Sequence, residues 1–211
     1  VDISEEKLKY ILADIRLNND FSRYQNDKDK NVLEALGNIE MLDYVLSTED
    51  RIEVWKLSKL QKLLYKYTPF GSEMLFPRQS NNIINGAEVS TVDYKLVPQE
   101  LIKVGDSIND LIKNKETLTL HEYILETLKI HHRLTVIHPL EDGNGRCCRG
   151  ILLWLLRLKN IPPIYIKLED KPRYIDALNK IDTKKDYDYL ELFILEQIIH
   201  SMVIFDEKLE L

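Results

Sequence analysis

One apolar segment constrains the fold of this chain more than any other feature. Residues 151–156 read ILLWLL, so a helix over them would be apolar on every face. Such a helix has to be surrounded by other elements, because none of its faces suits water. The rest of the chain consists largely of segments whose apolar residues recur at helical spacing. We therefore predict an all-α fold in which helices pack around a central helix over residues 144–159.

Seven further helices are expected around the central one. Ser4 suits the N-cap of the first, and Thr119 with Glu122 forms a capping box ahead of the fifth. Gly37 is expected to weaken the second helix, because glycine has a low helix propensity. The expected ranges are 4–18, 32–46, 52–67, 98–113, 119–137, 170–181 and 188–205.

One β signal interrupts this helical pattern. Residues 80–91 place the pair Asn85-Gly86 between short apolar segments, and Asn-Gly is the strongest two-residue hairpin turn. A small β-hairpin is expected here. On local sequence alone, a surface hairpin without a role fits as well as a functional one.

Length and charge narrow the class of protein. The 211 residues suit one domain, with residues 23–31 as a polar linker. The 29 basic and 35 acidic residues give a net charge of −6, which argues against general binding to nucleic acid or to an anionic membrane. Cys147 and Cys148 are adjacent and make no ordinary disulfide framework, so we expect a reducing, cytoplasmic location. We expect neither a signal peptide nor a membrane span.

The chemistry of the chain is concentrated in HPLEDGNGRCCRG, from His138 to Gly150. Two glycines around Asn144 free backbone N–H groups just ahead of a helix, whose N-terminus adds partial positive charge. This combination predicts an anion site. Arg146 and Arg149 are three residues apart and share a helix face, which suits a polyphosphate better than a single carboxylate.

Two further side chains of this segment suit phosphate chemistry. Asp142 is a hard oxygen ligand of the kind that Mg²⁺ takes when it bridges phosphates. His138 is a candidate proton acceptor that titrates near neutrality. Taken singly, such residues more often serve as turns, packed side chains or solvated charges. Their combination within twelve residues makes coincidence the weaker explanation.

The segment resembles the signature of the Fic family, His-x-Phe-x-Asp/Glu-Gly-Asn-Gly-Arg-x-x-Arg, at every specified position except Leu140, where the family usually has Phe. The resemblance covers about 52–197 and leaves about 1–48 as an N-terminal helical extension. It implies a Fic-like helical bundle in which the hairpin is a flap that docks the target protein. The flap residues expected to do so are Ile83, Ile84, Asn85 and Gly86.

The resemblance also implies an activity, the transfer of AMP from ATP to a hydroxyl of a target protein. His138 would be the general base, and Asp142 would hold Mg²⁺. Tyr174 would lie near the adenine, unless it is simply a core residue. The Doc branch, which phosphorylates instead, has Ala-Asn-Lys-Arg where this chain has residues 143–146, so AMP transfer is favoured. The implied phosphate-binding residues are Gly143, Asn144, Gly145, Arg146 and Arg149.

The chain departs from the family in its regulatory motif. Many Fic proteins carry an inhibitory helix with Ser/Thr-x-x-x-Glu-Gly/Asn, but no Ser or Thr of this chain has Glu four residues later. Either the chain is uninhibited, or a small antitoxin-like partner supplies the Glu, or another acidic residue substitutes. We expect no autoinhibition through that motif.

Other functions remain open. A nucleotide-binding or partner-binding module without catalysis would keep the same residues, and a Fic-like transferase could use another donor nucleotide. A zinc site from His131, His132, His138 and the two cysteines is weaker, because no C-x-x-C spacing exists. A P-loop NTPase is weaker still, because the Lys-Ser/Thr ending is absent.

Overall fold

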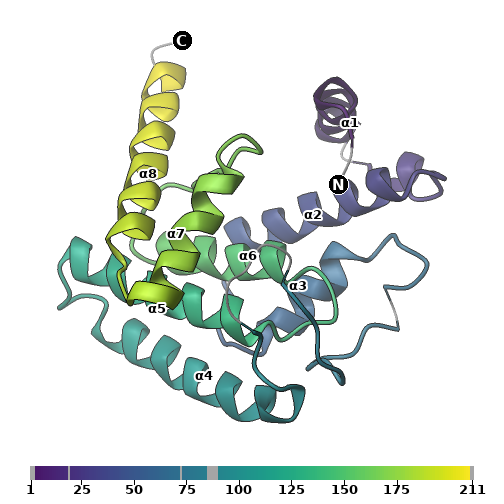
Figure 1. The fold of residues 1–211 in the computed structure, drawn as a ribbon. Coiled ribbons are helices and arrows are strands. Elements are labelled where there is room, and N and C mark those ends of the chain that lie inside the picture. Colours follow the sequence, from purple (N-terminus) through teal and green to yellow (C-terminus); the bar gives the residue numbers. More distant parts are fainter. Residues whose placement is uncertain (1–2, 19, 72, 85–89, 210–211) are drawn as a thin grey trace.

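The computed structural model describes residues 3–18, 20–71, 73–84 and 90–209, and the described residues form eight α-helices and two short 3-10 helices (Figure 1). The prediction of an all-α fold is confirmed, and a helix is found near each predicted range. Their bounds are α1 (Glu5–Asn18), η1 (Ser22–Tyr24), α2 (Lys30–Ser47), α3 (Lys56–Leu64), η2 (Tyr94–Leu96), α4 (Val97–Asn114), α5 (Leu120–Ile137), α6 (Asn144–Arg157), α7 (Lys171–Lys184) and α8 (Asp188–Leu209).

Helix α6 lies at the centre of the bundle (Figure 1). From Ile151 to Leu156 every residue is buried, and the most accessible, Leu153, is only 8% exposed. Helices α2, α3 and α5 pack against α6, and α5 packs in turn against α4 and α8. The neighbours of α6 therefore hold its N-terminal turn in place. None of the helices in the described ranges has the length and apolar character needed to cross a bilayer.

Helix α2 connects the N-terminal residues to this core. It packs against α3 and α6, and it shares a smaller apolar cluster with α1 that contains Ile11, Ile15, Val32 and Leu36. Gly37 is required for the first of these contacts, because a Cβ there would lie 2.0 Å from the carbonyl oxygen of Leu64. The residue expected to weaken α2 therefore allows α2 and α3 to approach closely.

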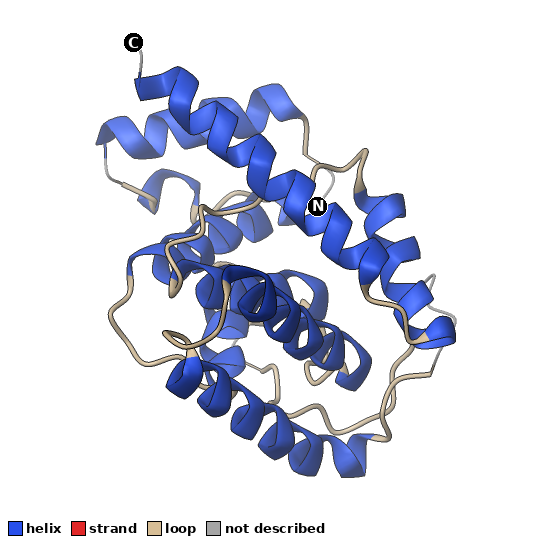
Figure 2. Cartoon of the chain, turned by 90° about the vertical axis from the view of Figure 1, so that its left-hand side faces the viewer, coloured by secondary structure: helices blue, strands red, loops and turns tan. Residues whose placement is uncertain are grey.

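The predicted hairpin is not seen in the part of the chain that the structure describes. Its turn, Asn85-Gly86, lies outside the described residues, and no strand is drawn on either side of it (Figure 2). The backbone groups of the flanking residues have other partners: the Thr91 hydroxyl donates to the Asn82 carbonyl at 2.7 Å, and the Val92 amide donates to the Val136 carbonyl at 3.3 Å. These bonds replace a strand ladder.

Candidate active site

A short loop joins α5 to α6 and brings the motif residues together. Both ends of the loop are left-handed: His138, the C-cap of α5, has φ 51° and ψ 56°, and Gly143, the N-cap of α6, has φ 81°. Asn144, the first residue of α6, closes the loop: its side chain accepts from the Leu140 amide and donates to the Leu140 carbonyl, both at 2.8 Å. Leu140 is fully buried, so leucine anchors the loop where the family usually has Phe.

The first turn of α6 presents unpartnered amides. The first intrahelical bond runs from the Cys147 amide to the Gly143 carbonyl at 2.9 Å. The amides of Asn144, Gly145 and Arg146 therefore have no intrahelical acceptor, as at any helix N-terminus. The Gly143 amide is bonded to Asp142 Oδ1 at 2.7 Å. The amides available to an anion thus begin at Asn144, whose side-chain amide is already occupied by Leu140.

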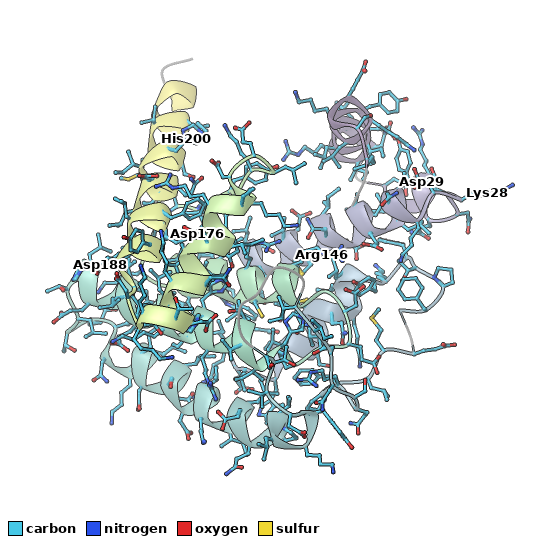
Figure 3. All side chains as sticks on the ribbon, in the orientation of Figure 1. Lys28, Asp29, Arg146, Asp176, Asp188 and His200 are labelled. Atoms are coloured by element: carbon cyan, nitrogen blue, oxygen red, sulfur yellow. The ribbon has the colours of Figure 1, made fainter. Side chains whose placement is uncertain are left out.

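The two motif arginines have different surroundings. Arg146 lies between α2 and α6 (Figure 3), where its Nη1 contacts Glu34 Oε2 and its Nη2 donates to the Tyr65 hydroxyl, both at 2.8 Å. No carboxylate of the described residues pairs with Arg149, which lies beside the Tyr174 hydroxyl instead. Helix α6 begins at Asn144, so these arginines, three residues apart, lie on one face of it, and both line one cavity of about 250 Å³. Its other walls are formed by Asn38, Met41, Leu42, Gly150, Leu152, Leu153, Ile164, Tyr165 and Ile166.

His138 has the surroundings of a neutral base. Its Nδ1 faces the Thr135 carbonyl at 3.4 Å, a long contact that places the ring proton on Nδ1 and leaves Nε2 without a partner among the residues described here. Burial lowers the pKa of the imidazole below its usual 6.5, the Thr135 carbonyl opposes that shift, and the Arg78 charge adds to it. His138 is therefore neutral near pH 7 and can accept a proton at Nε2.

Asp142, the predicted metal ligand, is one of two exposed carboxylates of the loop; the other, Glu141, accepts a bond of 3.2 Å from the Leu75 amide. The backbone carbonyl of Asp142 accepts a bond of 3.2 Å from Gln61 Nε2. Across the described ranges, no group of three or more His, Cys, Asp or Glu side chains could hold a metal ion. A single exposed carboxylate fits Mg²⁺, which takes one or two protein ligands and completes its shell with phosphate oxygens and water.

Arg78 is a residue of the site that the sequence did not reveal. It is only 1% exposed, and its guanidinium donates to the carbonyls of His138 (2.7 Å), Ile137 (3.3 Å), Ser80 and Val92. It thereby ties both segments that flank the expected flap to the end of α5. The only available signal was its place in FPRQSNNIING, just ahead of that flap.

Tyr174 is a residue of α7 and lies in the core, where it contacts α5, α6 and α8. Its hydroxyl is 2.6 Å from His131 Nε2, and His131 Nδ1 is 3.2 Å from the Cys148 carbonyl. Burial lowers the pKa of His131 to about 3 and raises that of Tyr174 to about 12, so both are neutral. Because both ring nitrogens of His131 are occupied and both cysteines are buried, the structure gives no support to a zinc site. A contact between Tyr174 and adenine remains a prediction.

Together the fold and the site define an all-α protein with a glycine-containing loop at the N-terminus of its central helix. A sequence model of the Fic/DOC family matches residues 51–156, about half of the chain. The chain therefore belongs to the Fic/DOC family, and the resemblance of its motif is confirmed.

Two relatives are named for an enzymatic activity. The chain is 34% identical over 83 residues to the protein adenylyltransferase Fic of Nematostella vectensis, a match that covers 39% of this chain and 19% of that protein. It is 25% identical over 141 residues to the protein adenylyltransferase fic-1 of Caenorhabditis elegans, covering 67% and 22%. The chain thus spans about a fifth of the length of these relatives.

Solved structures share the fold. Fic-1 of C. elegans (residues 134–508) superposes with a TM-score of 0.76 at 18% identity, over 99% of this chain and 59% of that one. A Fic domain containing signaling protein of Bacteroides thetaiotaomicron gives 0.66 at 19% identity, over 96% and 89%. BepC of Bartonella tribocorum, solved with bound AMPPNP, gives 0.61 at 16% identity, over 81% and 88%. These likenesses support the fold alone.

Proposed function

We propose that this chain is a protein adenylyltransferase that moves AMP from ATP to a hydroxyl side chain of a target protein. One juxtaposition carries the proposal. A neutral histidine, whose Nε2 has no partner among the described residues, stands one short loop before a helix N-terminus that carries two arginines and amides without an intrahelical acceptor. The family membership and the names of the relatives support it. Catalysis of this kind depends mainly on positioning and charge stabilisation, which a rigid loop on a buried helix supplies.

The proposed transfer needs one base, His138. The oxygen of a target Ser, Thr or Tyr forms a bond to the α-phosphorus, and its proton passes to His138 Nε2. The bond between the α-phosphorus and the oxygen that bridges to the β-phosphate breaks. Pyrophosphate leaves with that electron pair, and the target keeps AMP as a phosphodiester. His138 returns its proton to solvent before the next cycle.

The remaining motif residues bind the nucleotide. The amides of Asn144 and Gly145 face the phosphates at the positive end of α6, and the Gly143 amide joins them if it exchanges its bond to Asp142. Arg146 and Arg149 take the β- and γ-phosphates. Asp142 holds Mg²⁺, which when bound neutralises charge on the phosphates and on the leaving pyrophosphate. The cavity beside the arginines has largely apolar walls, which suits part of a nucleotide.

The target segment docks beside His138, along the residues that flank the flap. Ile83 is 88% exposed, and the preceding residue, Asn82, donates to the Leu140 carbonyl of the motif loop at 3.2 Å, so a target segment that contacts Ile83 would lie close to that loop. Ile84 lies next to it, whereas Asn85 and Gly86 lie outside the described residues, so their part in docking remains a prediction. The buried, unpaired cysteines accord with a target in the cytoplasm.

A second candidate, an inhibited nucleotide-binding module, is favoured by one specific contact. Glu34 occupies Arg146 through an ion pair that is largely shielded from solvent, and a bound phosphate would have to displace it. Glu34 is thus a candidate for the acidic residue that substitutes for the missing inhibitory motif. A small antitoxin-like partner remains the other way to supply such a carboxylate.

Intact mass spectrometry tests the proposal directly. The protein is incubated with ATP and Mg²⁺, alone and with cell lysate, beside the His138→Ala variant. The gain of one AMP on the protein or on a lysate protein, absent with the variant, is expected. Measurable ATP binding without any such product would favour the inhibited module over the transferase.

A further inference from the structure

Tyr65 lies directly beneath the motif loop. It is the C-cap of α3 and is fully buried. A Cβ added to Gly143 would lie 3.0 Å from Tyr65 Cε2 and 3.4 Å from its hydroxyl oxygen. The phenol ring therefore packs directly against Gly143 of the motif loop.

The hydroxyl of Tyr65 has charged neighbours on two sides. It accepts a bond of 2.8 Å from Arg146 Nη2, and it can donate to the Asp142 carboxylate, which lies within its hydrogen-bonding reach. An ordinary phenol keeps its proton at neutral pH, so this hydroxyl is neutral. One neutral group thus accepts from a phosphate-binding arginine and donates to the carboxylate of the candidate metal site.

The position of this hydroxyl is tightly fixed. The Tyr65 carbonyl accepts a bond of 2.8 Å from the Thr68 hydroxyl, and its ring packs against Phe70 with 5.6 Å between ring centroids. One turn earlier on α3, Gln61 holds the backbone of Asp142. Helix α3 therefore positions the metal-binding residue through two side chains, from outside the motif.

The two partners of Arg146, Glu34 and Tyr65, would be affected differently by a bound phosphate. Glu34 is anionic, so a phosphate competes with it for the guanidinium. Tyr65 is neutral, so its bond to Arg146 is compatible with a bound phosphate. Tyr65 can hold Arg146 in place throughout the reaction.

We propose that Tyr65 is a positioning residue that fixes the Asp142 carboxylate and the Arg146 guanidinium relative to each other, so that a polyphosphate and its Mg²⁺ bind as one unit. The inference rests on the proposed function and deepens it, since it names a part of the magnesium-nucleotide site outside the motif. Residues that orient a metal ligand typically contribute 10- to 100-fold to metal affinity or activity.

Tyr65→Phe removes only the hydroxyl, and Tyr123→Phe is its matched control. Tyr123 is also fully buried, and its hydroxyl donates to the Leu155 carbonyl at 2.7 Å, away from the loop. Binding of an ATP analogue with a methylene group between the α- and β-phosphates is measured by calorimetry at several Mg²⁺ concentrations and in EDTA. This analogue cannot undergo AMP transfer, so the readout is independent of turnover.

We expect Tyr65→Phe to weaken binding of the analogue about 10-fold or more in Mg²⁺, to weaken it less in EDTA, and to raise the Mg²⁺ concentration at which binding is half-maximal. Tyr123→Phe should stay within about two-fold of wild type. Equal affinities for the two variants, whether unchanged or equally weakened, would overturn the inference. Wild-type protein that binds no analogue at any Mg²⁺ concentration would overturn the proposed function itself, a result distinct from a defect confined to one variant.

Discussion

The two sides of the loop that carries His138 are held in different ways. On one side, residues 142–149, which we propose bind phosphate and call the phosphate side, the backbone of α6 and a left-handed glycine form the structure within a few consecutive residues. On the other side, residues 78–84 and 90–92, which we propose dock the target and call the docking side, the described residues form no strand. One buried side chain, Arg78, links these segments to α5 through hydrogen bonds. The first side is encoded locally, and the second depends on a contact between residues 60 apart in the chain.

The energetics of the docking side explain why arginine is suited to it. No carboxylate among the described residues forms an ion pair with Arg78. Its acceptors are carbonyl oxygens, including those of Ile137 and His138 at the C-terminal end of α5. A helix C-terminus carries partial negative charge, which stabilises a nearby cation. Several donors in one plane satisfy carbonyls from three segments at once. The same group therefore holds Ser80 and Val92, on either side of the expected flap, and His138, the proposed general base.

Loss of His138 should have the largest effect, because both sides serve this residue. We expect His138→Ala to lower the rate of AMP transfer on the order of 10²–10⁴-fold, since one positioned base is removed. Affinity for the ATP analogue should change little, because no phosphate ligand is lost. Quenched-time-course mass spectrometry gives the rate and calorimetry the affinity. Near-normal turnover would remove His138 from the mechanism.

Arg78→Lys should break the docking side alone. Lysine keeps the charge but cannot reach carbonyls of three segments, so the flap flanks and His138 lose their common support. We expect the rate of transfer to fall about 10- to 100-fold and the free energy of unfolding by about 1–3 kcal/mol, from unpaired carbonyls. Affinity for the ATP analogue should stay within about two-fold of wild type.

Arg157→Lys is the matched control for that change. Arg157 also donates to backbone carbonyls, those of Leu46 and Thr48 at the end of α2, far from the loop in sequence. It should show a comparable loss of unfolding free energy, measured by urea denaturation, without the loss of rate. A parallel loss of rate in both variants would mean that general loosening, not placement of His138, explains the effect of Arg78.

Gly143→Ala should break the phosphate side. Gly143 has φ 81°, and an added Cβ would lie 2.7 Å from Leu64 Cδ2; the backbone strain alone costs about 1–2 kcal/mol. We expect affinity for the ATP analogue to fall about 10-fold as the loop shifts off α3. Gly105→Ala, a helical glycine in α4, is the control and should bind normally. Retained affinity in Gly143→Ala would show that the loop tolerates a different backbone.

The difference between the two sides also explains what the sequence could predict. The eight helices, the capping box at Thr119 and the motif loop follow from local patterns, and the structure confirms them. Arg78, Glu34 and Tyr65 were missed because each acts through a residue far along the chain; Glu34 lies 112 positions from Arg146. The hairpin was expected from a local turn signal, whereas the described flanking residues bond to α5 and to one another's side chains.

Glu34→Gln should strengthen binding of the ATP analogue on the phosphate side, and this change should be smaller than those above. The ion pair with Arg146 is lost and the guanidinium is freed, so a bound phosphate no longer competes with a carboxylate. We expect the ATP analogue to bind about five-fold more tightly, which corresponds to about 1 kcal/mol for such a pair. Glu40→Gln, on the same helix but paired with Lys66, should leave affinity unchanged. Weaker binding in Glu34→Gln would mean that Glu34 supports Arg146 rather than competes for it.

The pH dependence of the transfer rate should show the smallest effect, and its sign follows from the burial of the His138 imidazole. The pKa of His138 is lowered from 6.5, so the imidazole stays neutral to lower pH than an exposed histidine, and the rate at saturating ATP should remain above half its plateau at pH 6.5.

The pKa of His131 is lowered to about 3, whereas an unfolded histidine binds its proton near 6.5. The unfolding free energy therefore decreases as pH falls below 6.5, by up to about 1.4 kcal/mol per pH unit. Rates measured between pH 6 and 8, with thermal unfolding followed alongside, separate the two effects. A midpoint above pH 6.5 in protein that remains folded would contradict the assignment of a buried, neutral His138 as the base.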